Sequence, residues 1–181
     1  MMLRSFLPRL LLLVSVLSGC RRTTKPSDRQ MMERFECHAP AFERLRALAA
    51  KYPPFHYPPL DEGDSTVLLL APEDRQALDS LLGLTGIERL YYEGEAEVRL
   101  MVSTWGLAVS GGYKEYIYAP SLQAEMKKYS EELAQDPVLA RFIVKGITNE
   151  DLDQVARRYS KSLDLYRPLG NAWYLHLSRE Y

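Results

Sequence analysis

Three histidines and two cysteines are the residues of this sequence best suited to metal binding or nucleophilic chemistry. The histidines, His38, His56 and His176, lie far apart in the chain. No His-x-x-x-His or Cys-x-x-Cys spacing is present, whereas a zinc site needs three or four convergent His, Cys or acidic ligands. The sequence therefore predicts no metal site and no cofactor. Each histidine is expected to be an ordinary loop or sheet residue.

Catalytic motifs built on serine, glycine or cysteine are also missing. Ser110 lacks the first glycine of Gly-x-Ser-x-Gly, so no nucleophile elbow is predicted. The following Gly111-Gly112 pair has no Gly-Lys-Ser/Thr after it, and a turn between strands explains both glycines better than a phosphate loop. Cys37 precedes His38, but adjacent residues on a helix or strand seldom face each other well enough for proton transfer. No catalytic residue is assigned.

Acidic residues leave one enzymatic alternative open. A glycosidase needs two carboxylates at a set separation across a cleft, and sequence spacing does not define that separation. No window has the alternating oxygen ligands and distal Glu of a calcium loop. The acidic groups fall in the stretches 61–64, 93–97 and 150–153.

Tyrosine is the most unusual feature of the composition, with 12 residues. Tyr92, Tyr113, Tyr116 and Tyr118 lie on or beside three predicted strands and are the candidate binding residues. Alternation places Tyr116 and Tyr118 on one face of their strand. Tyrosine is enriched at recognition surfaces because it buries a large ring and keeps a hydrated hydroxyl. Half-buried strand positions also favour aromatic residues, so a core role remains open.

The N-terminus has the features of an export signal. Arg4 and Arg9 form a positive segment, and the apolar run over 10–17 is too short to span a bilayer. Leu17-Ser18-Gly19-Cys20 resembles the lipobox of bacterial lipoproteins. This resemblance covers residues 1–20 and implies removal of residues 1–19 and a thioether-linked diacylglycerol on Cys20. It also implies a further acyl chain, such as palmitate, on the new amine.

The same resemblance predicts where the protein resides. Two or three acyl chains anchor a protein stably, whereas one holds it only marginally. In double-membraned bacteria, Asp after the lipidated cysteine favours retention in the inner membrane. Arg21 stands there instead, so the expected location is the cell envelope, on the periplasmic side of the outer membrane.

Composition excludes one class of partner. Removing residues 1–19 from the 181 leaves 162, enough for one domain. The chain has 23 basic and 24 acidic side chains, and loss of Arg4 and Arg9 leaves 21 against 24, a net charge near −3. Nucleic-acid-binding domains are normally strongly basic, so no nucleic acid is expected. Cys37 is then the single remaining cysteine, either a buried thiol or the site of an intermolecular disulfide that forms a dimer.

Three segments are predicted: a signal peptide over 1–19, a lipidated Cys20 with a flexible basic stalk to residue 30, and one domain over 31–181. The stalk is inferred because residues 21–30 include no aliphatic or aromatic side chain. Strands over 87–93, 96–104 and 115–119 predict an antiparallel meander. Segments 164–169 and 172–177 predict a closing hairpin around Gly170-Asn171, with Trp173 facing the core and Tyr174 and His176 outward. Apolar periodicity predicts several packed helices, and the fold class is therefore α+β.

These features predict a membrane-tethered binding or interaction module. It could act as an inhibitor, an immunity-type protector or an accessory subunit, with an envelope protein as its partner. The closing hairpin, Gly170-Asn171-Ala172-Trp173-Tyr174-Leu175, resembles that of other small bacterial lipoproteins. The alternatives are an envelope hydrolase whose carboxylates converge only in the fold, and a purely structural tether.

Overall fold

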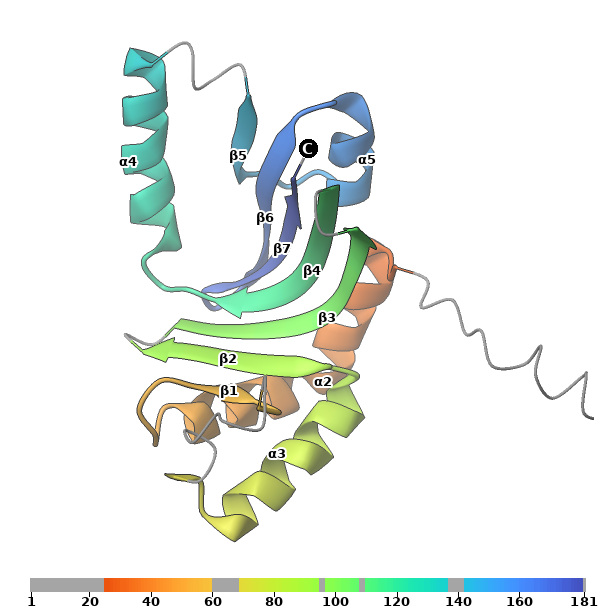
Figure 1. Ribbon diagram of the computed structural model, residues 1–181, viewed down its shortest axis with the longest axis vertical. Helices are drawn as coiled ribbons and strands as arrows, with labels where there is room; N and C mark the ends of the chain where they lie inside the picture. Colours follow the sequence, from red (N-terminus) through yellow and green to blue (C-terminus); the bar gives the residue numbers. More distant parts are fainter. Residues whose placement is uncertain (1–24, 60–68, 95–96, 108–109, 137–141, 181) are drawn as a thin grey trace, which may run out of the picture.

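One seven-stranded sheet organises the domain. The computed structural model describes residues 25–59, 69–94, 97–107, 110–136 and 142–180. Within these ranges four α-helices surround the sheet, which confirms the predicted α+β class (Figure 1). The elements are α2 (Asp28–Ala49), β1 (Phe55–Tyr57), α3 (Pro72–Thr85), β2 (Arg89–Gly94), β3 (Glu97–Leu107), β4 (Ser110–Tyr118), α4 (Leu122–Gln135), β5 (Ile143–Ile147), α5 (Leu152–Arg158), β6 (Ser162–Gly170) and β7 (Trp173–Arg179).

The meander and the closing hairpin are both confirmed. The strand order is β1-β2-β3-β4-β7-β6-β5, and β5 pairs with β6 in the one parallel contact of the described sheet. Asn171 and Ala172 have φ values of 52° and 64°, which suit a two-residue hairpin turn of type I′. The turn predicted at 110–112 is wrong. Gly111 and Gly112 lie inside β4, opposite Gly106 and Trp105, because β3 continues alongside them and supplies ladder partners.

Helix α2 begins earlier than the sequence suggests. Ser27 caps it through a reciprocal capping box with Gln30, and a kink at His38 precedes Pro40. Asp28, in its first turn, is fully buried. The predicted flexible stalk therefore differs from the structure over 25–30, where the chain already packs on the domain; 21–24 and Cys20 lie outside the described residues. No helix among the described residues is long and apolar enough to cross a bilayer.

Helices cover both faces of the sheet, which explains one wrong prediction. The larger core packs α2, α3 and α5 on one face around Trp173, which is 1% exposed. A smaller cluster on the other face joins α4 to Ile117, Tyr166 and Tyr174. Tyr174 and His176 were expected to face outward, but both are 4% exposed. That expectation assumed that one sheet face is open to water.

Candidate functional site

A row of five charged side chains crosses the sheet on the face opposite α2. The charges alternate in sign along the strand order β3-β4-β7-β6-β5. Arg99 Nη2 lies 3.0 Å from Glu115 Oε1, which lies 2.7 Å from His176 Nδ1. His176 Nε2 lies 2.5 Å from Asp164 Oδ1, and Asp164 Oδ2 lies 2.7 Å from Lys145 Nζ. These five residues are called the charged row below.

Sheet register brings the charged row together from distant parts of the sequence. Glu115 stands directly opposite His176, and Lys145 stands opposite Asp164. Because side chains alternate between faces along a strand, Glu115 points away from Lys114 and Tyr116, its neighbours in β4. Five strands therefore each contribute one charge to the same face.

The centre of the charged row is buried, and its two ends are partly exposed to solvent. The Glu115 side chain is fully buried and that of His176 is 5% exposed, whereas Arg99 and Lys145 are each 27% exposed. The imidazole of His176 stacks parallel on Tyr166, with ring centroids 4.3 Å apart. Glu115 Oε2 is buried with no hydrogen-bond partner among the described residues. Whether His176 is protonated therefore determines whether the carboxylates of Glu115 and Asp164 have a positive charge between them.

The surrounding carboxylates favour the protonated form of His176 by raising its pKa. Burial alone would lower the pKa of His176, but its hydrogen bonds to Asp164 and Glu115 outweigh burial and raise the pKa above 6.5. Burial likewise opposes ionisation of Asp164, yet its hydrogen bond with His176 and the Lys145 charge lower its pKa. Since a carboxylate engages each ring nitrogen, His176 has no free nitrogen with which to act as a general base. The charged row is therefore suited to holding five strands in register.

A second polar cluster lies on the opposite face, around the buried Lys114. Its ammonium lies 2.6 Å from both Asp28 Oδ1 and Asp153 Oδ2, and donates to the Pro26 carbonyl at 3.2 Å. The other oxygen of Asp28 accepts from the Leu152 backbone N–H. These contacts join β4 to the start of α2 and to α5.

Three carboxylates at this Lys114 cluster have the spacing of a metal site, but two of them already bind ammonium groups. Oxygens of Asp28, Asp151 and Asp153 lie within 4.8 Å of one another. Lys114 contacts two of these residues, and Lys25 Nζ lies 2.7 Å from Asp153 Oδ1. Burial would raise the pKa of Asp153, but the hydrogen bonds from the two lysines lower it. Lysine ammonium groups thus already balance the charges of Asp28 and Asp153, and Asp151 accepts from the Gln154 N–H.

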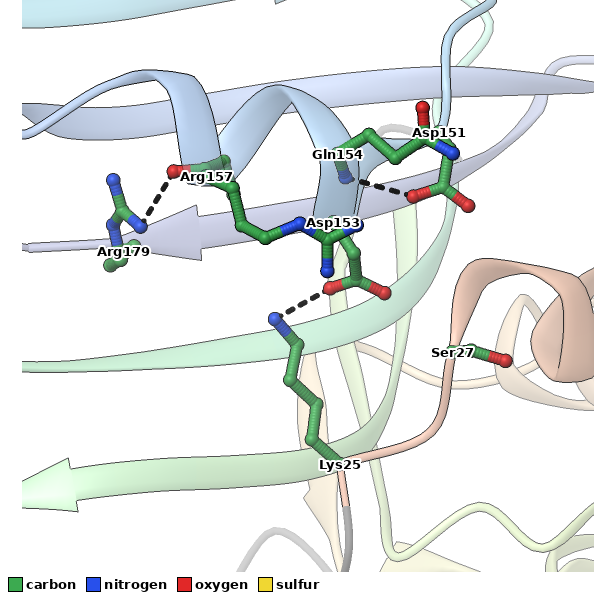
Figure 2. A pocket seen from close by; sticks show the side chains of 8 residues that line it. Lys25, Ser27, Asp151, Asp153, Gln154, Arg157 and Arg179 are labelled. Carbon is green, nitrogen blue, oxygen red and sulfur yellow. Dashed lines mark hydrogen bonds and ion pairs between the residues drawn. The ribbon is translucent and has the colours of Figure 1, made fainter.

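A hollow of about 430 Å³ lies beside this cluster, against α5 (Figure 2). Figure 2 shows Lys25 reaching Asp153 from below α5, and Arg157 running along the helix above it. Arg179 supports the far end of α5 by donating to the carbonyls of Ala156 and Tyr159. The hollow is lined by Lys25, Ser27, Asp151, Asp153, Gln154, Ala156, Arg157 and Arg179.

The tyrosines proposed from sequence as binding residues do not form an exposed surface. Tyr116 is fully buried under α2 and donates to the Met31 carbonyl at 2.8 Å. Tyr92 is 9% exposed, and the half-buried Tyr118 packs against Trp173. Tyr113 lies on the other face, where its hydroxyl accepts from Arg99. The prediction of a tyrosine recognition face is wrong because α2 covers the face that Tyr116 and Tyr118 share.

The cysteine and histidine predictions have mixed outcomes. Cys37 is exposed, so the expected buried thiol is wrong, and the intermolecular disulfide stays a prediction. His56 is an ordinary strand residue beside Tyr91, with ring centroids 5.0 Å apart. His176 is a strand residue too, but it stands at the centre of the charged row, a role that its isolation in the sequence concealed.

The folded domain covers nearly the same residues as a match to a known domain family. Residues 24–181 match the family model described as Domain of unknown function (DUF4948). No curated protein and no solved structure shows significant similarity to the chain. The match begins one residue before Lys25, whose ion pair with Asp153 is the first contact of the described fold. Because the match extends over most of the sequence, the chain belongs to the DUF4948 family.

Proposed function

We propose that this protein is an envelope lipoprotein, anchored through Cys20, whose α+β domain is a binding module. The observation that carries the anchoring proposal is the position of the domain boundary. The family match starts at residue 24, so the apolar segment and the lipobox-like sequence lie outside the domain. Arg21 after the cysteine favours the outer membrane, on its periplasmic side.

Replacement of Cys20 by serine should abolish lipid attachment. A serine hydroxyl does not form the thioether that holds the diacylglycerol, so incorporation of labelled palmitate should fall to background. The matched control is Cys37→Ser, which removes the other cysteine and should leave incorporation at the wild-type level. Equal labelling of the wild type and Cys20→Ser would refute the anchor.

A groove between α2 and α3 is the best candidate for the binding surface. Two adjoining hollows of about 410 and 260 Å³ share Arg44, Ala77 and Leu81. Leu84 lines the first hollow, is 57% exposed, and extends the apolar surface formed there by Ala77 and Leu81. Arg44 and Glu73 provide one charge of each sign at the rim. An amphipathic helix of an envelope protein fits this combination of apolar floor and mixed rim.

The direction of α2 places this groove away from the anchor. Helix α2 runs from Asp28 to Ala49 with a kink at His38, and Arg44 of the groove lies in its second half. The chain enters at the first turn of α2, whereas α3 packs toward the opposite end of the domain (Figure 1). A domain tethered at its N-terminus therefore presents the groove outward, toward a partner.

Leu84→Asp should weaken retention of the groove partner by about tenfold or more, because an apolar anchor in an interface is replaced by a charge. The measurement is affinity capture from envelope extract with the wild-type and variant proteins. Phe142→Asp is the matched control, since Phe142 is 64% exposed but lies outside the groove. A partner that both variants lose equally, or that neither loses, would contradict the groove as binding site.

A further inference from the structure

We propose that the surface around α5 binds the anionic headgroups of the membrane in which Cys20 is anchored. This α5 face consists of Lys25, Arg157, Arg158, Tyr159 and Lys161. The inference rests on the proposed lipid anchor and adds to it a defined orientation of the domain on the membrane. Its partner is a bilayer surface that carries phosphate groups and a net negative charge.

The short connection to the anchor holds this face close to the bilayer. Four residues, 21–24, separate Cys20 from Lys25. At 3.3–3.6 Å per residue, the Cα atoms of Cys20 and Lys25 can be at most about 18 Å apart. Lys25 is tied to α5 by its 2.7 Å ion pair with Asp153. The lipid anchor therefore keeps Lys25, and with it the start of α5, within reach of the headgroups.

The exposed residues of the α5 face suit an anionic interface. Arg157, Arg158 and Tyr159 are successive exposed residues at the end of α5, and Lys161 follows after one serine. Tyr159 is 40% exposed, and tyrosine is enriched at the boundary between headgroups and hydrocarbon. Arg157 also lines the hollow beside Lys25 (Figure 2). Basic side chains this close to an anionic leaflet add to membrane affinity.

The acidic residues near this face are engaged with partners of their own. Asp153 is shared by Lys114 and Lys25, and Asp151 caps α5 by accepting from the Gln154 N–H. Glu150 lies 2.7 Å from Arg158, but both side chains are more than half exposed. Such a surface pair is weak and screened by salt, so it does not withhold Arg158 from a phosphate. The positive charge that can contact a phosphate therefore comes from Arg157 and Arg158.

The test uses the lipidated protein reconstituted in two kinds of vesicle. One contains about a third phosphatidylglycerol, which is anionic, and the other is wholly phosphatidylcholine, which is zwitterionic. Hydrogen exchange of the amides in 157–161 is measured on each. We expect exchange about fivefold slower or more on the anionic vesicles, and no difference at about 0.5 M salt. Arg157→Glu with Arg158→Glu should abolish the difference. The adjacent exposed pair Lys127→Glu with Lys128→Glu on α4 is the matched control and should preserve it.

Flotation of the same vesicles separates this inference from the anchor. If the protein floats with both vesicle types but exchange is the same on each, the anchor stands and the α5 face is overturned. If it floats with neither, both proposals are overturned. If it floats with anionic vesicles alone and Arg157→Glu with Arg158→Glu prevents this, the anchor fails and the face is supported. If the protein floats with anionic vesicles alone and the two substitutions leave this unchanged, both the anchor and the α5 face are overturned.

Discussion

Replacing the buried Lys114 by methionine should lower the free energy of unfolding by about 3–5 kcal/mol. Methionine has a similar volume, so the loss comes from charge rather than from a cavity. The change leaves the fully buried Asp28 without its 2.6 Å partner, and it removes one of the two ammonium groups that contact Asp153. Asp28 is then left with Arg167, whose Nη1 lies 3.6 Å from Asp28 Oδ2, and a buried carboxylate that loses its closest cation is costly. Urea unfolding followed by circular dichroism measures the effect.

Two controls assign the loss to the buried charge pair. Lys114→Met combined with Asp28→Asn removes both charges and should recover about half of the lost stability, because the asparagine still accepts from the Leu152 N–H. Lys128→Met removes an exposed lysine whose partner Glu132 lies 3.8 Å away, and should change stability by less than about 0.5 kcal/mol. A loss equal to that of Lys128→Met would show that Lys114 contributes no buried pairing.

The elements of this fold could be predicted because their signals are local. Alternation of apolar and polar residues located β3, and Gly170-Asn171 located the closing hairpin. The burial of polar residues could not be predicted in the same way, since it depends on partners far away in the sequence. Asp28 meets Lys114 across 86 residues and the Leu152 backbone across 124. The segment 25–30 therefore resembled a flexible stalk, although its Asp28 is fully buried.

One signal for the buried lysine was present in the sequence. Alternation puts Lys114 on the same face as Tyr116 and Tyr118, with Glu115 on the other. If that face is covered, the lysine is covered too and needs a carboxylate partner. The tyrosines were instead expected to form an exposed recognition face, because a single strand does not reveal which helices pack over it. The position of α2 decided between the two interpretations.

The Lys114 cluster and the charged row each contain a residue of β4, Lys114 and Glu115, which are adjacent in the sequence. Lys114 fastens the start of α2 and α5 to one face of the sheet, while Glu115 ties β3 to β7 through Arg99 and His176 on the other. The chain enters the domain at Lys25, directly beside the Lys114 cluster. In a tethered protein this is the point at which any pull from the anchor reaches the fold. The buried charge pairs at that point oppose movement of α2 along β4. A shift of one residue would separate Lys114 from its carboxylate partners.

The stability of the domain should fall as pH rises through the raised pKa of His176. A group whose pKa is higher in the folded than in the unfolded state stabilises the fold fully below its unfolded pKa, here near 6.5. That contribution is lost as pH rises and the folded-state imidazole gives up its proton. Asp164 behaves oppositely, because its lowered pKa makes its contribution disappear only in acid. Unfolding free energies from about pH 6 to about pH 9 isolate the histidine.

His176→Gln should remove this pH dependence and lower stability by about 3 kcal/mol at the acid end of that range. Glutamine is neutral, so the carboxylates of Glu115 and Asp164 lose the positive charge between them. The difference from wild type should shrink as pH rises, since deprotonation removes the same charge from the native protein. His56→Gln, which changes a half-exposed histidine outside the charged row, should keep the wild-type slope. If the curves of unfolding free energy against pH were parallel for wild type and His176→Gln, His176 would be neutral in the folded protein. The charged row would then have no positive charge at its centre.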